Sequence, residues 1–124
     1  MEKMSEQAGW QYSEYGSDKS VVIVPLANNR FQAVLAQEKM IDGKKRYLFA
    51  SKICVCGPEI DLKELLLNNI YFIYSRFVIE YDILRLAAGV YEAHAEEALL
   101  MEMIMEVARG ADEWENKLTG LDVN

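Results

Sequence analysis

The sequence is poor in the residues on which several protein classes depend. It has 2 cysteines, 2 prolines and 1 histidine among 124 residues. Cys54 and Cys56 are separated by one residue, so a disulfide between them would be strained, and we expect two buried core thiols instead. Two thiols do not complete a tetrahedral metal site, and the single histidine, His94, is distant in sequence. We therefore predict no metal and no cofactor.

Long apolar runs are also missing. The most apolar stretch, Leu62–Leu86, contains Lys63, Glu64, Arg76 and further charges, which are costly in the hydrocarbon of a bilayer. Residues 1–20 are polar and show no apolar run followed by a small-residue cleavage site. The sequence therefore predicts no membrane contact, no signal peptide and a cytoplasmic location.

Motifs of common catalysts are absent as well. The chain has no GxxxxGK[ST] or GxGxxG phosphate loop and no GxSxG turn. A nucleophile activated by histidine would have to use His94, and an enzyme in which His94 acts with Glu80 or Glu97 is a hypothesis left open. We predict no catalytic residue and expect a non-enzymatic protein.

The charge that is present is unevenly distributed. Residues 1–85 carry 11 acids and 11 bases, whereas residues 86–124 carry 9 acids and 2 bases, so the last third supplies the whole net charge of −7. Binding to nucleic acid needs clustered lysine and arginine that displace counterions. Because the net charge is negative and the last third of the chain is acidic, we do not expect nucleic acid to be the partner.

The first half of the chain is typical of an antiparallel sheet. Residues 1–19 show no clear period and are interpreted as an irregular arm, with one short strand across Trp10–Tyr15 as an option. Val21–Leu26 contains Pro25, which indicates an edge strand. Phe31–Ile41 and Lys45–Cys56 flank Asp42-Gly43, the dipeptide that favours a type I′ hairpin. We expect a meander of three or four strands over residues 20–57.

The second half is interpreted as two long helices over residues 61–118. Asp61 and Glu64 resemble a capping box that begins the first helix, Leu62–Leu86. That helix would be apolar on two stripes, so the sheet and either the second helix or another subunit must cover it. The first stripe is Leu66, Ile70, Ile73, Phe77 and Leu84, and the second is Leu65, Phe72, Ile79 and Ile83. The second helix spans about residues 90–118, with one long bent helix as the alternative. The predicted fold is a single α+β domain over residues 1–124 that forms a homodimer or a higher homo-oligomer.

One face of the second predicted helix is a candidate protein-binding surface. Its acidic side includes two apolar residues four positions apart, and apolar residues surrounded by charge are typical of interfaces. A solvated face that keeps the protein soluble is the alternative. The candidate partner-binding residues, expected to contact a protein with a basic surface, are Glu92, Glu96, Leu99, Glu102, Met103 and Glu106.

His94 and Glu97 fall within the apolar arc of the same helix, three residues apart. We expect them to join Arg76, Glu80 and Asp82 in a buried polar network, because buried polar groups need internal partners. A metal site of Glu80, His94 and Glu97 is a further alternative. So is a pocket that sequesters a small anionic, nucleotide-like ligand, lined by Arg76, His94, Arg109, Tyr71 and Tyr91.

The remaining basic cluster is Lys44, Lys45 and Arg46, with Lys52 nearby. Such charges protect sheet edges, and a small anion contact is the alternative. In size and charge the chain resembles phage-encoded inhibitors, immunity proteins and secretion chaperones. Secretion chaperones begin with a helix, whereas the sequence predicts none here. The hypothesis is therefore a binding or inhibitory protein.

Overall fold

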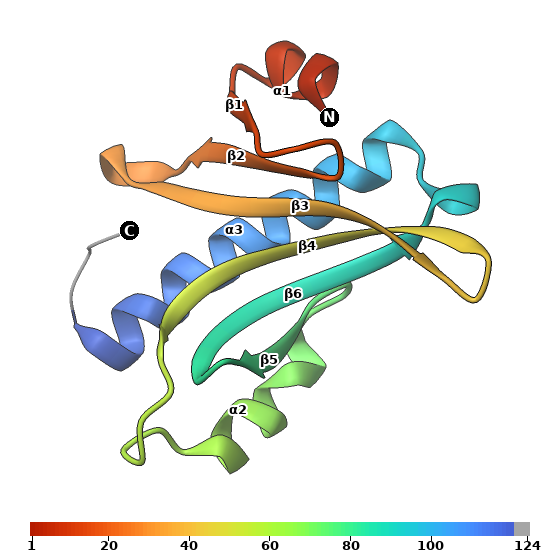
Figure 1. Cartoon of the computed structure of the whole chain (residues 1–124). Coiled ribbons are helices and arrows are strands. Elements are labelled where there is room, and N and C mark those ends of the chain that lie inside the picture. Colours follow the sequence, from red (N-terminus) through yellow and green to blue (C-terminus); the bar gives the residue numbers. More distant parts are fainter. Residues whose placement is uncertain (121–124) are drawn as a thin grey trace.

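The computed structural model describes residues 1–120 and has an α+β architecture (Figure 1). Within these residues, six strands form one antiparallel sheet in the order β1-β2-β3-β4-β6-β5. The elements are α1 (Glu2–Ala8), β1 (Gln11–Glu14), β2 (Lys19–Pro25), η1 (Ala27–Asn29), β3 (Phe31–Ile41), β4 (Lys44–Val55), α2 (Leu62–Asn68), η2 (Asn69–Tyr71), β5 (Arg76–Glu80), β6 (Ile83–Tyr91), η3 (Glu92–His94) and α3 (Glu97–Thr119).

The hairpin between β3 and β4 forms where the sequence predicts it. Asp42 and Gly43 have φ angles of 53° and 75°, so both central residues of the turn are left-handed, as a type I′ turn requires. The register pairs Ile41 with Lys44 and continues to Leu35 and Ala50. The prediction of a hairpin at Asp42-Gly43 is confirmed.

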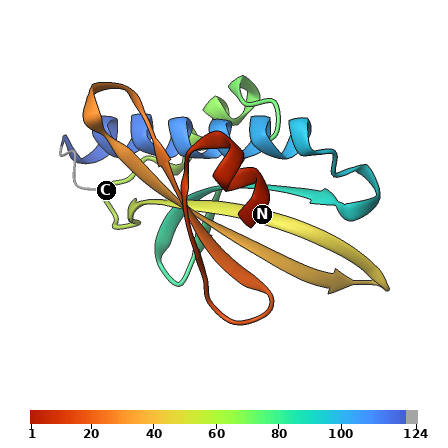
Figure 2. The same ribbon diagram turned by 90° about the horizontal axis from the view of Figure 1, so that it is seen from above.

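One face of the sheet is covered by α3, and α2 lies on the same side (Figure 2). Alternate residues of each strand point to this side, because side chains of a strand alternate between faces. Along β6, for example, Leu84, Leu86 and Ala88 are buried while their neighbours are more exposed. The buried apolar core is Met4, Val22, Val24, Val34, Ala36, Phe49, Ile53, Leu65, Leu84, Leu86, Ala88, Met103, Ile104, Val107, Ala108, Ala111 and Trp114.

The helix α3 approaches the sheet closely at Gly110. A β-carbon at this position would press on the side chain of Leu86 and lie 3.0 Å from the ring of Phe72. Gly110 is therefore required by packing, although glycine is a poor helix former. The helix ends at Gly120, whose φ of 67° is the left-handed conformation common at helix C-termini.

The prediction of a first long helix over Leu62–Leu86 is wrong. Asp61 does cap a helix, since its side chain accepts a hydrogen bond from the amide of Glu64 at 3.1 Å, but α2 ends at Asn68. Residues 76–91 form the hairpin β5–β6 instead. Its turn uses Tyr81 and Asp82 at φ values of 53° and 60° without a glycine, so no strong turn signal marked it.

Three further predictions are corrected. Residues 1–19 are not an irregular arm, because they contain α1, whereas the optional strand across Trp10–Tyr15 is present as β1. The strand β2 is not an edge strand, because β1 pairs with it from Gln11 to Glu14. The second helix begins at Glu97 rather than near Val90, and Gly89 lies within β6. The C-terminal half thus supplies one long helix and two strands. Within residues 1–120, no helix is both long and apolar enough to cross a membrane.

Candidate protein-binding surfaces

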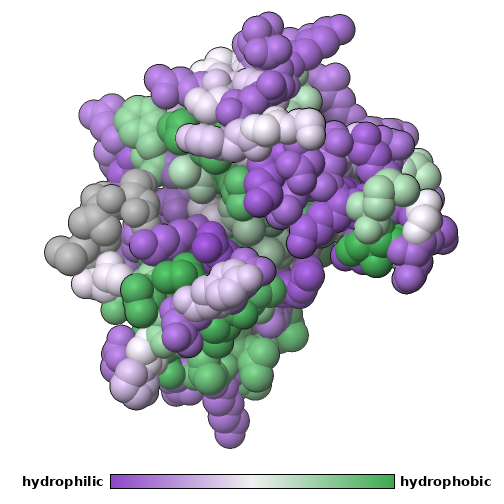
Figure 3. All heavy atoms as spheres, viewed as in Figure 1, coloured by the Kyte–Doolittle hydropathy of each residue, from purple (hydrophilic) through white to green (hydrophobic). Residues whose placement is uncertain are grey.

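An exposed apolar surface lies on α2 and the segments that follow it. Ile70 and Ile73 are 78% and 82% exposed, which is unusual for isoleucine in a folded domain. Scattered apolar residues are ordinary, but a continuous group marks a site of protein contact. In Figure 3 the hydrophobic residues gather in the lower part of the view, where Figure 1 places α2 and β5. This α2–β5 surface consists of Leu62, Leu66, Leu67, Ile70, Tyr71, Ile73, Ile79 and Tyr81.

The inner side of the same segment is anchored in the core. Leu65 is buried in a cluster with Leu84 and Leu86, and Phe72 packs against it. The rings of Phe72 and Phe77 meet edge to face at 5.5 Å, and Phe77 meets Trp114 in the same way at 5.1 Å. The segment is therefore held in place while its outer side chains stay uncovered.

The carboxylate of Glu106 fixes the loop that carries Ile73. One oxygen accepts from the amide of Ile73 at 2.8 Å, and the other accepts from the amides of Tyr74 and Ser75 at 2.9 and 2.8 Å. The hydroxyl of Ser75 donates to it at 2.6 Å. Burial alone would raise the pKa of Glu106, but these hydrogen bonds outweigh it and lower the pKa below its usual value.

The neighbouring acid on α3 is engaged as well. The hydroxyl of Tyr74 donates to the carboxylate of Glu102 at 2.5 Å, and this hydrogen bond is the main reason why the pKa of Tyr74 is raised. Glu102 and Glu106, both predicted to contact a partner, therefore bind the loop of their own chain.

The six predicted partner-binding residues do not form one helix face. Met103 is 2% exposed and belongs to the core, so its predicted exposure is wrong. Glu92 lies in η3, before the helix, and accepts from the hydroxyl of Tyr47 at 3.0 Å. Glu96 is the exposed residue that precedes α3, and Leu99 is half-buried against the core. Whether any of the six contacts a partner stays a prediction.

The five residues of the alternative ligand pocket are divided among separate hollows. Tyr71 and Arg109 line a groove of 590 Å³ beside α3. Arg76 and Tyr91 line a small hollow of 230 Å³ at the start of β5. His94 shares a third hollow with Tyr91. No single pocket brings the five together in residues 1–120, because the pair of helices expected to join them does not exist.

The predicted buried network of His94 and Glu97 is also corrected. Both residues are exposed, since residue 94 lies in η3 and residue 97 begins α3. In the described part of the chain, no group of three or more histidine, cysteine, aspartate or glutamate side chains is arranged to hold a metal ion.

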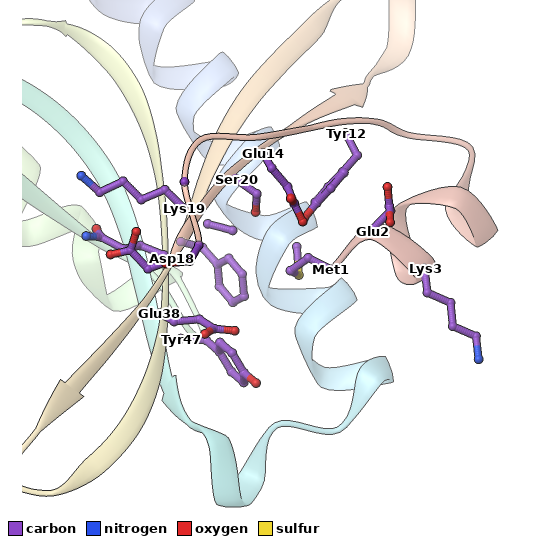
Figure 4. A pocket seen from close by; sticks show the side chains of 15 residues that line it. Met1, Glu2, Lys3, Tyr12, Glu14, Asp18, Lys19, Ser20, Glu38 and Tyr47 are labelled. Carbon is purple, nitrogen blue, oxygen red and sulfur yellow. The ribbon is translucent and has the colours of Figure 1, made fainter.

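A further hollow of 330 Å³ lies between α1, the β1–β2 connection and the first half of β4. Figure 4 shows Tyr12 and Glu14 converging at its wall, where the hydroxyl of Tyr12 donates to Glu14 at 2.9 Å. Burial, followed by this hydrogen bond, raises the pKa of Tyr12. Four acids and two lysines line the hollow, so side chains of both charges surround it.

Sequence reasoning found part of the α2–β5 surface. Leu66, Ile70 and Ile73 were expected on an apolar stripe that another element or another subunit must cover. These three are exposed along the α2 segment, whereas Phe77 and Leu84, assigned to the same stripe, pack in the core because the long helix was wrong. The signal that located them was the high number of apolar residues after Asp61, which is more than one face of a sheet can bury.

The fold, but not the sequence, is similar to known proteins. No protein-family model and no curated protein matches this sequence. A chain of the HopA1–SchA chaperone–effector complex is 11% identical with a TM-score of 0.63, over 92% of this chain and 88% of that chain. A chain of the ExoU–SpcU complex from the type III secretion system of Pseudomonas aeruginosa is 12% identical with a TM-score of 0.65, over 98% of this chain and 99% of that one. At these identities the likeness shows a shared fold.

Proposed function

We propose that this chain is a protein-binding protein of the secretion-chaperone type, which acts as a homodimer and holds another protein. The observation that carries the proposal is the uncovered α2–β5 surface on a fold that also occurs in a chaperone–effector complex and in a heterodimeric complex of a type III secretion system. The N-terminal helix α1 supports it too, since its expected absence was the argument against this class.

The α2–β5 surface suits contact with a second copy of the chain. Two-fold dimers use the same patch on both subunits, which an apolar surface with few charges permits without repulsion. Leu66, Ile70 and Ile73 are anchored from behind by the core and by Glu106, so little side-chain or loop order is lost on association.

The first experiment tests this dimer. We expect the chain to elute as a dimer in size-exclusion chromatography with light scattering. The double variant Leu66→Asp/Ile70→Asp should weaken the dimer by about 30-fold or more, because central apolar residues contribute about 2 kcal/mol or more to interfaces. Met40→Asp is the control, since Met40 is 67% exposed but lies at the distant β3–β4 hairpin. A wild-type monomer, or a dimer indifferent to the double variant, contradicts the proposal.

The second experiment tests the protein partner. The tagged chain is cross-linked in its source cells, and each captured protein is purified and recombined with it. We expect one of them to form a complex of defined stoichiometry in native mass spectrometry. An inhibitor or immunity protein, the finer function predicted from the sequence, would in addition block the activity of that partner. If no captured protein recombines with the purified chain, the binding function is rejected.

A cytoplasmic site of action remains part of the proposal. The thiols of Cys54 and Cys56 are both free, as expected in a reducing compartment. The pKa of the Cys54 thiol is raised, mainly by burial, which makes it a poor nucleophile at neutral pH.

A further inference from the structure

The face of the sheet turned away from α3 carries an unusual pattern of charge. We call it the open sheet face; no helix lies over it within residues 1–120, as Figures 1 and 2 show. Its cationic residues come from five strands, and Glu80, at the far end of β5, is the acid among its strand positions. The cations are Lys19, Lys39, Lys44, Arg46, Lys52, Arg76 and Arg85.

Two pairs of these cations lie directly opposite each other on neighbouring strands. Lys39 of β3 faces Arg46 of β4, and Lys52 of β4 faces Arg85 of β6. Like charges in opposite positions of an antiparallel ladder destabilise the sheet. The isolated chain therefore gains nothing from this arrangement, which points to a use outside the chain.

No carboxylate of the described residues neutralises these four cations. Within residues 1–120, the salt bridges of Lys45, Lys117 and Arg30 do not involve any of them. The Nε of Arg85 is buried and has no hydrogen-bond partner among these residues, so it is a donor without an acceptor. By contrast Lys45, on the other face of β4, bonds to two carboxylates.

An apolar row crosses the centre of the open sheet face. Val21, Leu35, Ala50 and Ala87 occupy matching positions on β2, β3, β4 and β6, and all four are half-buried. The pair Lys39 and Arg46 lies on one side of this row, and the pair Lys52 and Arg85 lies on the other. The surface therefore combines an apolar middle with a basic border on both sides.

The pattern specifies the shape of its occupant. A sheet face offers side chains but no free backbone groups, so a segment that buries its backbone there must satisfy its own hydrogen bonds, as a helix does. An apolar stripe on that helix would cover the row, and acids on both flanks would meet the two pairs of cations. We propose that the open sheet face binds an acidic amphipathic helix of the partner protein.

This inference names the partner chemistry of the proposed function and rests on it, but its test does not need the native partner or the dimer. The probe is a fluorescent synthetic helical peptide with a leucine stripe flanked on both sides by glutamates. One control peptide has the same composition with the stripe scrambled, and another has lysine in place of glutamate. Binding is measured by fluorescence anisotropy with the full chain.

We expect the striped acidic peptide to bind at least tenfold more tightly than either control peptide. The variant Arg46→Glu/Lys52→Glu should lose about tenfold in affinity, because each reversal turns a favourable charge contact into repulsion. The control variant Lys3→Glu/Lys63→Glu has the same net charge, changes two exposed lysines on α1 and α2, and should bind as the wild type does. Circular dichroism verifies that both variants fold.

Several outcomes would overturn the inference. Equal binding of the scrambled peptide would reduce the surface to a non-specific cation patch. Tighter binding of a single-stranded oligonucleotide, abolished by the same double variant, would assign the face to nucleic acid. Salt-sensitive self-association abolished by that variant, without peptide binding, would assign it to the acidic α3 of a second copy. In each case a dimer that responds to Leu66→Asp/Ile70→Asp leaves the proposed function standing.

Discussion

The two faces of the sheet differ in how their polar and charged side chains are paired. On the face that α3 covers, the buried amide of Gln32 donates to the hydroxyl of Ser51 at 2.9 Å, and Lys45 lies 3.3 Å from carboxylates of both Glu38 and Glu92. On the open sheet face, Lys52 and Arg85 oppose each other without such partners. The difference teaches that charges on the first face are paired within the chain, whereas Lys52 and Arg85 leave their charges available for the acidic helix that we propose as the occupant.

The largest expected effect is on the unfolding free energy, and it compares how tightly the two faces of the sheet are packed. Leu86→Ala removes a fully buried side chain from the covered face and should cost about 3 kcal/mol of unfolding free energy. Leu48→Ala removes the same group from the half-buried open sheet face and should cost about 1 kcal/mol. Urea denaturation measures both, and equal losses would mean that the open sheet face is packed in the isolated chain.

Gly110→Ala tests how closely α3 approaches the covered face. Alanine favours the helix by about 1 kcal/mol. Its methyl group would nevertheless press on Leu86 and Phe72, and overpacking of this kind costs about 1–3 kcal/mol. We expect a net loss of stability in thermal unfolding, with Arg109→Ala as the exposed control on the same helix. A stabilised Gly110→Ala protein would contradict the close contact.

Glu106→Gln tests the link between α3 and the loop of the α2–β5 surface. Loss of the charged acceptor should cost about 1–2 kcal/mol, and Glu113→Gln, at an exposed position, should cost less. The pKa of Glu106 is lower in the folded chain than its ordinary value of 4.5. Its contribution is therefore complete above that value and is lost as pH falls through the lower, folded pKa. The difference between wild type and variant should shrink on acidification, and a constant difference would exclude the charge as the cause.

The smallest effect has the opposite sign. Lys52→Glu replaces a repulsive pair with Arg85 by an attractive one, so it should raise the unfolding free energy by about 0.5 kcal/mol. Lys19→Glu is the control on the same face, because Lys19 faces the uncharged Gln37. A variant that is more stable but binds the acidic peptide less well would show that the two faces serve different ends. Destabilisation would show that Lys52 supports the fold.

Local signals in the sequence predicted some elements well. Asp42-Gly43 specified its hairpin because the turn chemistry is decided by two residues. Asp61 specified the start of α2, since a cap also acts locally. The α+β class and an apolar stripe in need of cover followed from the same reasoning, and so did a long acidic helix near the C-terminus.

The errors arose where one sequence pattern fits both a helix and a strand. Residues such as Leu84 and Leu86 fit an apolar helix stripe as well as the inward side of a strand. The turn at Tyr81-Asp82 lacks glycine, so nothing interrupted the helical pattern there. Met103 was assigned to the wrong side of its helix. Lys52 and Arg85 belong to β4 and β6, which are distant in sequence, so their pairing could be recognised only once the register of the sheet was known.

The order of the strands has a consequence for how the chain folds. The ladder between β4 and β6 begins with Val55 opposite Ile83, so α2 and β5 lie within the loop that this pairing closes. Closing a loop costs chain entropy that a short hairpin such as β3–β4 largely avoids. The β5–β6 hairpin is itself local, but the pairing of β4 with β6 that joins it to the rest of the sheet requires this longer loop to close. The α2–β5 surface is therefore complete only when β4 and β6 have paired, so a chain in which that pairing is open lacks the surface.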